Sequence, residues 1–177
     1  MSSLNSAKLK RGMSGDKDVP FCFKLIKAAS AAAAAAAARD VMAGNMAMEK
    51  FYAGLQASAR DWLQLGILIT QNNGEIVPRS AVETLLTPSS LNTGYGLGVW
   101  LGSPEDGTRE YGPSTALAVP SAEPFILQDT AFFDGFGGQR VYMSQSAELV
   151  IVRIGDVRFD WDDTALPNLA AKALGLK

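Results

Sequence analysis

The sequence predicts an α+β fold, in which helices pack on an antiparallel sheet. Apolar residues recur at helical spacing between residues 58 and 88 and again after residue 162. Between residues 94 and 155 the apolar residues alternate with other residues or form a continuous run, as they do in strands. The order is therefore helices, strand, glycine-rich corner, antiparallel strands and a final helix, which is typical of an α+β domain.

Composition favours a single globular domain. The chain has 177 residues, of which 47% are hydrophobic and 19% are charged, so it has the length and the apolar content to bury a core. Its net charge of −2 gives no argument for binding a polyanion. We therefore expect no nucleic-acid partner.

Two residue types limit the chemistry that the chain can carry. It has no histidine, so it cannot by itself form a Ser-His-Asp or Cys-His catalytic site or a histidine-ligated metal site. Cys22 is the single cysteine, so no intrachain disulfide can form. The cysteine content therefore does not indicate whether the protein resides in an oxidising or a reducing compartment. We expect no metal and no cofactor.

The first part of the chain differs in composition from the rest. Residues 1–27 are rich in serine, glycine and lysine, carry a net charge of +4, and are predicted to form a basic flexible arm. Residues 28–50 begin with an alanine run and are predicted to be a helix or a poorly specified segment. Lys24 and Lys27 interrupt the apolar run from Phe21 to Ala38, which argues against an integral membrane segment. A secretory signal is an alternative for this run.

Ser14 and Lys17 match a Ser-x-x-Lys pattern, in which a lysine one helical turn after a serine can accept its proton. They are the candidate catalytic residues on this pattern alone. Gly12 and Gly15 disfavour the helix that the pattern requires, so a solvated tail is the alternative.

Two helices are predicted in the region that follows. Ser58 and Asp61 have the spacing of a capping box, and the helix that they begin is expected to end at Asn72-Asn73-Gly74. A second helix is expected to start at Pro78 and to end before Pro88.

Strands are predicted from Gly94 to Leu101, from Arg140 to Ser144 and from Glu148 to Gly155. In the first strand, the odd-numbered residues from Tyr95 to Leu101 are expected on one face. The other face is mostly glycine, which lets a helix or another backbone lie close. The continuous apolar run Leu149–Val152 predicts a strand that is covered on both faces.

A final helix is predicted through Leu176, capped by Asp162 or Asp163. Its packing side is expected to consist of Leu166, Leu169, Ala170, Ala173 and Leu174.

A glycine-rich corner precedes the last strands. Gly135, Gly137 and Gly138 lie within four residues, inside the stretch from Asp129 to Met143. Glycine permits a positive φ and the close approach of another group. The corner is therefore either a tight structural bend or the wall of a site.

Three blocks of the chain share a pattern with one superfamily. Residues 52–66 contain Gly-Leu-Gln-Ala-Ser-Ala-Arg-Asp, residues 95–100 read Tyr-Gly-Leu-Gly-Val-Trp, and residues 133–155 contain Gly-Phe-Gly-Gly-Gln-Arg-Val-Tyr. In this order they resemble the serine β-lactamase/penicillin-binding-protein-like hydrolases, particularly the class C-like and esterase-like members. The similarity covers residues 44–176, and residues 51–177 resemble the C-terminal part of such a domain.

The resemblance implies roles for residues near the corner. In that family a Ser-x-x-Lys turn acylates, a Tyr-x-Asn-type motif assists proton transfer, and a Lys/His-Thr/x-Gly strand motif lines the pocket. Only the third motif has an implied counterpart, Asp129-Thr130-Ala131, which departs from Lys-Thr-Gly at two of three positions. Thr130 would contact a substrate carbonyl or carboxylate, and a backbone amide near Phe132, within a shift of one to four residues, would serve the oxyanion hole.

The implied substrate-binding residues are Thr130, Phe132, Gly135, Phe136, Gly137 and Gln139. Arg60, Asp61 and Arg140 are further possible ligand contacts, and helix capping or surface ion pairs explain them more simply.

The resemblance implies an ester or amide hydrolase that acts on a β-lactam, a peptide or a small ester through an acyl-enzyme. The nucleophile is expected to be missing or on a separate piece, so that a complementary chain or oligomer completes the fold. A catalytically inactive interaction domain on the same scaffold is one alternative, and an unrelated α+β binding domain is another. The family resemblance suggests a periplasmic or secreted location, and a cytoplasmic location is the alternative.

Overall fold

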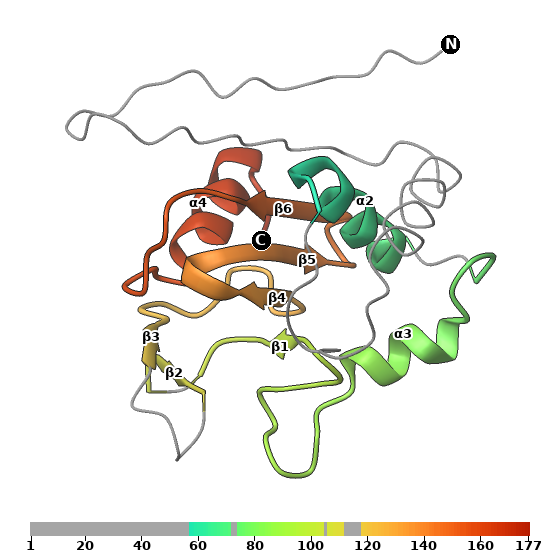
Figure 1. Ribbon diagram of the computed structural model, residues 1–177, viewed down its shortest axis with the longest axis horizontal. Coiled ribbons are helices and arrows are strands. Elements are labelled where there is room, and N and C mark those ends of the chain that lie inside the picture. The colour runs from blue at the N-terminus through green and yellow to red at the C-terminus, as the bar shows by residue number, and fades with distance from the viewer. Residues whose placement is uncertain (1–56, 72–73, 105, 112–117) are drawn as a thin grey trace.

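The computed structural model describes residues 57–71, 74–104, 106–111 and 118–177. Its strands are β1 (Trp100–Leu101), β2 (Thr108–Glu110), β3 (Ala118–Pro120), β4 (Ala131–Gly135), β5 (Gln139–Ser144) and β6 (Leu149–Arg153). A four-stranded antiparallel sheet has the order β1–β4–β5–β6, and β2 pairs with β3 separately (Figure 1). The predicted α+β class with an antiparallel sheet is confirmed. The expectations for residues 1–50, including Ser14 and Lys17, lie outside the described residues.

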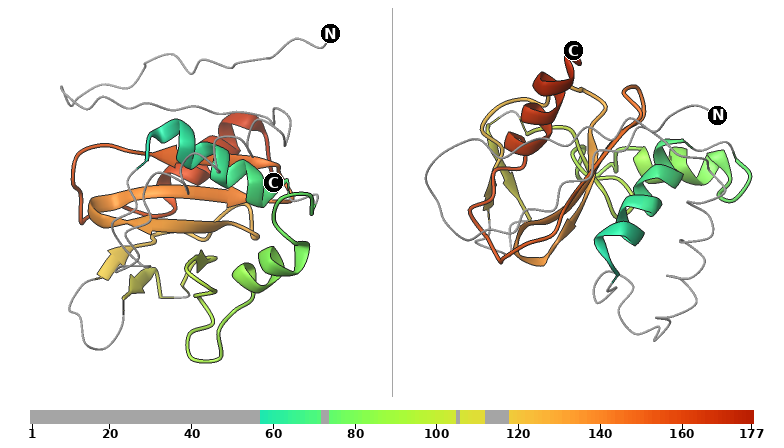
Figure 2. Two further views of the ribbon diagram at one scale, coloured as in Figure 1. Left: turned by 45° about the vertical axis from the view of Figure 1, so that its right-hand side comes forward. Right: turned by 90° about the horizontal axis from the view of Figure 1, so that it is seen from above.

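Helices cover both faces of the four-stranded sheet. They are α2 (Ala59–Thr70), α3 (Arg79–Leu86) and α4 (Ala165–Leu174), and a 3₁₀ turn, η1 (Phe136–Gly138), joins β4 to β5. Helix α2 packs on one face of the sheet and α4 on the other (Figure 2). The two-residue period of a strand produces this arrangement, because β5 directs Val141 and Met143 toward α2 and Tyr142 toward α4.

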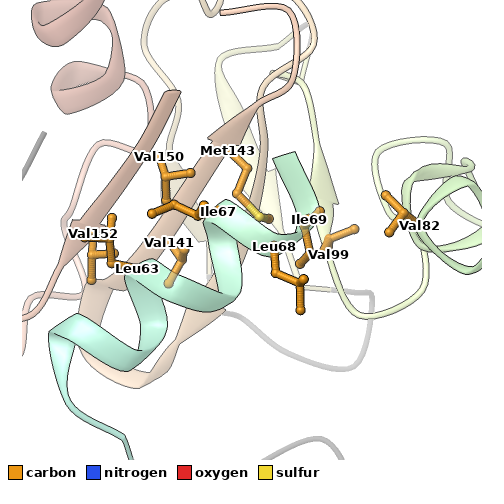
Figure 3. Close-up of a cluster of buried hydrophobic side chains, with 10 residues drawn as sticks. All are labelled: Leu63, Ile67, Leu68, Ile69, Val82, Val99, Val141, Met143, Val150 and Val152. Carbon is orange, nitrogen blue, oxygen red and sulfur yellow. The ribbon is translucent and has the colours of Figure 1, made fainter. Parts of the chain in front are cut away.

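Each face of the sheet has its own hydrophobic core. On the α2 side, Leu63 and Ile67 of the helix meet Val141, Val150 and Val152 of the sheet (Figure 3). The core on the α4 side consists of Phe125, Leu127, Phe132, Tyr142, Leu149, Ile151, Leu166 and Ala171. All residues of β6 are buried. The prediction that this strand is covered on both faces is therefore confirmed.

The start of α2 is the predicted capping box. The N–H of Asp61 donates to Ser58 Oγ at 3.3 Å, and the N–H of Ser58 donates to the Asp61 carboxylate at 3.0 Å. Hydrogen bonds from the hydroxyl and the backbone of Ser58 lower the pKa of Asp61. Helix α3 follows Pro78 and ends at Leu86, as predicted. Both helix starts are confirmed: the Ser58 side chain caps α2, and α3 begins directly after Pro78 without a side-chain cap.

The strand predicted from Gly94 to Leu101 is wrong over most of its length. Only Trp100 and Leu101 belong to a strand, and Tyr95 pairs back onto Trp100. The chain reverses at Leu97 and Gly98, where Gly98 has a φ of +83°. Leu97 is consequently 67% exposed while Val99 is fully buried, although the alternating pattern assigned them to one face. The turn at Gly98 therefore breaks the alternation of faces that the sequence pattern predicted for a strand.

The expected close approach on the glycine face occurs at Gly96. No side chain fits between Gly96 and α3, because a Cβ on Gly96 would lie 2.2 Å from the carbonyl oxygen of Leu85. The next residue, Leu97, donates its N–H to that same carbonyl at 3.1 Å. Gly96 therefore lets the reversal dock on the end of α3.

The packing side predicted for the last helix is partly wrong. Leu166 and Ala171 are buried, whereas Leu169 and Leu174 are exposed. Asn168 decides the orientation of α4, because its side chain accepts from Ile126 N–H at 2.8 Å and donates to the Pro124 carbonyl at 2.9 Å. These bonds turn the Asn168 side of the helix inward.

The caps predicted for α4 are corrected as well. Asp162 accepts from the N–H of Thr164 at 3.0 Å, just before the helix, and Asp163 serves no capping role. The carboxylate of Asp163 is buried against two arginines instead.

Within the described ranges, no helix has the length and the apolar character needed to cross a membrane.

Gly66 lies where α2 presses most closely on the sheet. A Cβ on Gly66 would lie 2.5 Å from Val150 Cγ1 and 3.2 Å from Val141 Cγ1. We expect Gly66→Ala to lower the free energy of unfolding by about 1–2 kcal/mol, because overpacking outweighs the gain in helix propensity. Urea denaturation measures this change. In the control Gly155→Ala, the nearest atom to the added Cβ is Arg153 Nη2 at 3.8 Å, and stability should hardly change. Equal losses in the two variants would contradict the close contact.

Candidate functional site

Four charged side chains are buried together on the α4 side of the sheet. Arg109 comes from β2, Asp134 from β4, Arg140 from β5, and Asp163 from the segment before α4. We call these four residues the charged cluster. Their side chains are 1–6% exposed, which is rare for charged groups unless they are paired.

Each carboxylate of the charged cluster bridges both arginines. Asp163 accepts from Arg109 Nε at 2.7 Å and from Arg140 Nε at 2.7 Å. Asp134 forms ion pairs with Arg109 Nη1 at 2.9 Å and with Arg140 Nη1. Positive and negative groups therefore alternate around a closed ring with no net charge. This pairing offsets the desolvation of the four ions.

The guanidinium of Arg109 is also packed between aromatic rings. It lies 4.3 Å from the ring centre of Trp100, 4.8 Å from that of Tyr111 and 5.3 Å from that of Phe132. Burial by itself would lower the pKa of Arg109, but the carboxylates of Asp163 and Asp134 outweigh that effect and raise it. Arg109 is therefore a fixed cation that holds β2 against the sheet.

Tyr111 connects the charged cluster to solvent. Its hydroxyl donates to Asp134 Oδ2 at 2.5 Å, and 42% of the residue is exposed. Burial of its hydroxyl end and the hydrogen bond to Asp134 raise the pKa of Tyr111. The phenol therefore stays protonated at neutral pH and acts as a hydrogen-bond donor.

The glycine corner is a tight structural bend. Gly137 and Gly138 have φ values of +70° and +82°. A Cβ on Gly137 would lie 2.9 Å from the side chain of Val157, and one on Gly138 would lie 2.8 Å from the carbonyl oxygen of Arg158. The segment after β6 therefore requires glycine at both positions.

Arg153 fastens the corner to that segment. Its Nη1 donates to the carbonyl of Gly138 at 2.6 Å, and its Nη2 donates to that of Asp156 at 3.2 Å. The guanidinium lies 4.1 Å from the ring centre of Trp161, whose Nε1 donates to the hydroxyl of Tyr142 at 3.0 Å. Burial lowers the pKa of Arg153.

Three of the substrate-binding residues expected from the sequence have side chains engaged within the fold. The hydroxyl of Thr130 donates to the Leu127 carbonyl at 2.6 Å, and the ring of Phe132 lies in the core. The amide of Gln139 donates to Gly155 O at 2.7 Å and accepts from Gly155 N at 2.9 Å. These side chains hold the strand ends in place.

The other expected residues lie at the corner itself. Gly135 and Gly137 present only backbone, and Phe136 is 79% exposed. The ring of Phe136 packs edge-on against Phe159, with their ring centres 5.3 Å apart. The structure thus brings Gly135, Phe136, Gly137 and Gln139 together, while Thr130 lies just before the opposite end of β4.

The backbone of Asp134 faces the side of β4 on which β1 pairs. Gly102 donates its N–H to the Thr130 carbonyl at 2.9 Å, so Thr130 directs its backbone groups toward β1. Alternation along the strand gives Phe132 and Asp134 the same direction. Strand β1 pairs with β4 only as far as Phe132, opposite Trp100. Beyond that pair, no described strand pairs with Asp134 on this side.

A cavity lies near the other end of β4. It has a volume of about 220 Å³ and is lined by Gly102, Ser103, Pro104, Gly107, Ser121, Ala122, Glu123, Pro124, Phe125 and Gln128. Ser103 Oγ accepts from Phe125 N–H at 2.9 Å, and Gln128 donates to the Phe125 carbonyl. In the part of the chain that the structure describes, no group of three or more His, Cys, Asp or Glu residues is arranged to hold a metal ion.

Comparison with models of known protein families gives no match, and comparison with curated proteins gives none either.

Sequence analysis missed the charged cluster. Arg140 was expected as a possible ligand contact or, more simply, in a surface ion pair, but its side chain is 1% exposed. Arg109 and Asp163 are 54 positions apart, so no local spacing signals their contact. The sequence feature that could have indicated the charged cluster is Arg140, because strand alternation places it on the same face as Tyr142.

Asp163 is expected to be the most sensitive member of the charged cluster. Asp163→Asn leaves Arg109 and Arg140 buried with one carboxylate between them, so unfolding free energy should fall by about 3–5 kcal/mol. The control Asp160→Asn removes a partner of Arg158 in an exposed pair, and stability should change little. Chemical denaturation compares the two variants. Equal stability of Asp163→Asn and the parent chain would contradict a structural role for the cluster.

Asp129, expected near a family motif, instead caps the turn between β5 and β6. Its carboxylate accepts from Ser146 N–H at 2.7 Å and from the hydroxyls of Ser144 and Ser146. Desolvation, which raises the pKa of Asp129, is outweighed by these hydrogen bonds, which lower it.

Asp129→Asn should therefore lose about 1 kcal/mol of stability at neutral pH, since the carboxylate is solvent-exposed. A lowered folded-state pKa means that the carboxylate stabilises the fold above its ordinary pKa of 3.8. This contribution disappears as the pH falls through the lower, folded-state value. Thermal unfolding of both proteins at several pH values should show the difference narrowing in acid, and a constant difference would contradict the capping role.

Proposed function

We propose that this chain is the C-terminal portion of a serine β-lactamase-like hydrolase that cleaves an ester or amide through an acyl-enzyme. In this proposal β4 is the strand beside which the substrate lies. The backbone amide of Asp134 donates to the substrate carbonyl and stabilises the oxyanion that develops on it.

The observation that carries the proposal is that β1, the described strand on this side of β4, pairs with it only as far as Phe132 and does not reach Asp134. Beyond Phe132, the last residue of β4 that pairs with β1, the strand makes three further pairs with β5, and its N–H at Asp134 points away from β5. This amide lies two residues from Phe132, inside the range that the family resemblance implies. The glycine corner follows immediately, so no side chain at Gly135 stands beside this position.

The charged cluster supports the proposal by holding Asp134 still. Its carboxylate is fixed by Arg109, Arg140 and Tyr111, and Arg140 Nη1 also donates to the carbonyl of Gly135 at 3.2 Å. An oxyanion donor is effective when it is oriented before the reaction, because no reorganisation is then needed in the transition state. The cluster would give the strand that rigidity.

The nucleophile in this proposal comes from elsewhere. None of the described serines is followed three positions later by a lysine. Ser14 and Lys17 have this spacing but lie outside the described residues. We therefore expect a complementary polypeptide to supply the acylating serine and its base.

An interaction domain without catalysis is the second candidate, and one observation favours it. Phe136 is 79% exposed and Phe159 is 54% exposed, and the two rings contact each other on the surface. Exposed aromatic pairs of this kind are typical anchors for protein partners.

Backbone NMR with a penicillin and with a small peptide amide tests the proposal. The amide signals of Asp134 and its neighbours in β4 should shift on titration, while those of α4 should not. Phe136→Ser retains the backbone amide and should leave these shifts in place, whereas it would abolish binding that depends on the aromatic pair. Absence of shifts at β4 with both ligands would overturn the proposal.

An acyl probe tests where the nucleophile lies. A fluorophosphonate should leave the intact mass of this chain unchanged under conditions that label a complete serine hydrolase of this class. A stoichiometric adduct on Ser14 would show that the chain carries its own nucleophile and would refute the need for a complementary piece.

A further inference from the structure

The cavity near the start of β4 has walls that hydrogen bonds hold in place. Ser121 donates its N–H to the Gly107 carbonyl at 2.8 Å, and Phe125 donates its N–H to Ser103 Oγ at 2.9 Å. The side-chain amide of Asn168 donates to the carbonyl of the residue before Phe125 at 2.9 Å. The cavity is therefore formed by the fold itself, as is usual for small-molecule sites.

Ser121, which lines this cavity, is a buried polar residue whose side chain has no partner. Only 2% of the residue is exposed, and its hydroxyl forms no hydrogen bond with any described residue. Buried hydroxyls in native proteins are nearly always paired, because an unpaired one loses its bonds to water without a replacement. The hydroxyl of Ser121 therefore needs a partner that a molecule in the cavity can supply.

Other polar groups of the lining also have bonding capacity left. Ser103 Oγ accepts from Phe125 N–H, and its own proton has no acceptor among the described residues. Gln128 Nε2 donates to the Phe125 carbonyl at 2.9 Å, which leaves the oxygen of that side-chain amide available. The carboxylate of Glu123 is 67% exposed and lies 3.8 Å from Lys172 Nζ in a surface pair. The lining thus contains both donors and acceptors.

The volume of the cavity limits the size of its ligand. It measures about 220 Å³, which is below the roughly 300–1,000 Å³ of sites for drug-sized ligands. It is also several times the roughly 30 Å³ that one water molecule takes up in the liquid. A compact molecule with a single ring suits this space better than one structural water.

We propose that the cavity binds a small uncharged polyhydroxylated ring, which is the chemistry of a monosaccharide. Hydroxyl groups both donate and accept, so they replace water at Ser103, Ser121 and Gln128 without leaving a polar group unpaired. The C–H faces of such a ring pack on the apolar surface that Pro104 and Pro124 add to the lining.

The charge of the lining argues against an anionic ligand. Glu123 is the one charged residue among the described residues that line the cavity, and its carboxylate repels another carboxylate. The ammonium of Lys172 compensates little, because the side chains of this pair are more than 60% exposed and solvent screens them. The site lies at the end of β4 opposite Asp134, so it does not depend on the proposed hydrolase activity.

Backbone NMR on the full chain with D-glucose, D-galactose and D-mannose tests the proposal. At least one of these sugars should shift the amide signals of Ser103, Ser121 and Phe125 in a saturable manner, while the signals of α2 stay in place. The uronic acid of the sugar that binds should cause smaller shifts at the same concentration, because it adds a carboxylate. Absence of a saturable shift with all three sugars, or equal binding of the uronic acid, would overturn the proposal.

The variant Ser121→Ala separates ligand binding from folding. The hydroxyl that it removes bonds to no described residue, so thermal unfolding should be unchanged. The dissociation constant of the sugar should rise about fivefold, since one hydrogen bond to the ligand is lost. The control Ser90→Ala removes an exposed hydroxyl outside the cavity and should change neither quantity. Unchanged sugar affinity of Ser121→Ala would contradict the proposal, and a large loss of its stability would show that the fold itself uses the hydroxyl.

The variant Glu123→Gln tests the preference for an uncharged ligand. Glu123 is exposed, so the variant should fold normally. The affinity for the uronic acid should rise toward that for the neutral sugar, because the repelling carboxylate is gone. An unchanged difference between the two ligands would contradict the role of Glu123 in selecting against anions.

Discussion

The paired contact of Asp163 with Arg109 and Arg140 is the interaction on which the arrangement of the α4 side depends. Each arginine reaches the carboxylate through its Nε at 2.7 Å, and Asp134 closes the ring from the other side. The ring joins β2, β4, β5 and the segment before α4. Among the residues that the structure describes, no other single contact connects all four of these segments. Its stability comes from the contact of each arginine with both carboxylates, because any one of these ions left alone in the core would be strongly unfavourable.

This constraint explains why the candidate site offers backbone rather than side chains. The polar side chains around β4 are used to hold the fold: Thr130 binds Leu127, and Gln139 binds Gly155. The amide of Asp134 and the exposed ring of Phe136 remain for a ligand or partner. Backbone amides of this kind can orient a carbonyl and stabilise charge on it, but they cannot attack it. The proposed function therefore assigns attack to another polypeptide.

The parts of the fold that sequence predicted well are those fixed by neighbouring residues. The capping box at Ser58 and the apolar run of β6 needed only short-range chemistry and a count of the period. Prediction failed where a distant segment decided the outcome. The face of α4 follows from the contacts of Asn168 with residues 124–126, and Leu97 is exposed because the chain reverses at Gly98 and docks on α3. In the candidate site, the corner glycines were found and the charged cluster was not.

The sequence by itself determined the α+β class, the helix starts and the covered strand β6. These follow from backbone conformation and local hydrogen bonds, which act between residues a few positions apart. Only the tertiary structure decided that Arg109 and Asp163, 54 positions apart, would share a buried ring. It also decided that β1 would pair with β4 only as far as Phe132 and that β6 would be the last of the described strands in the sheet order. Such contacts depend on how the sheet is ordered and on which segments cover it, and no local pattern encodes that order.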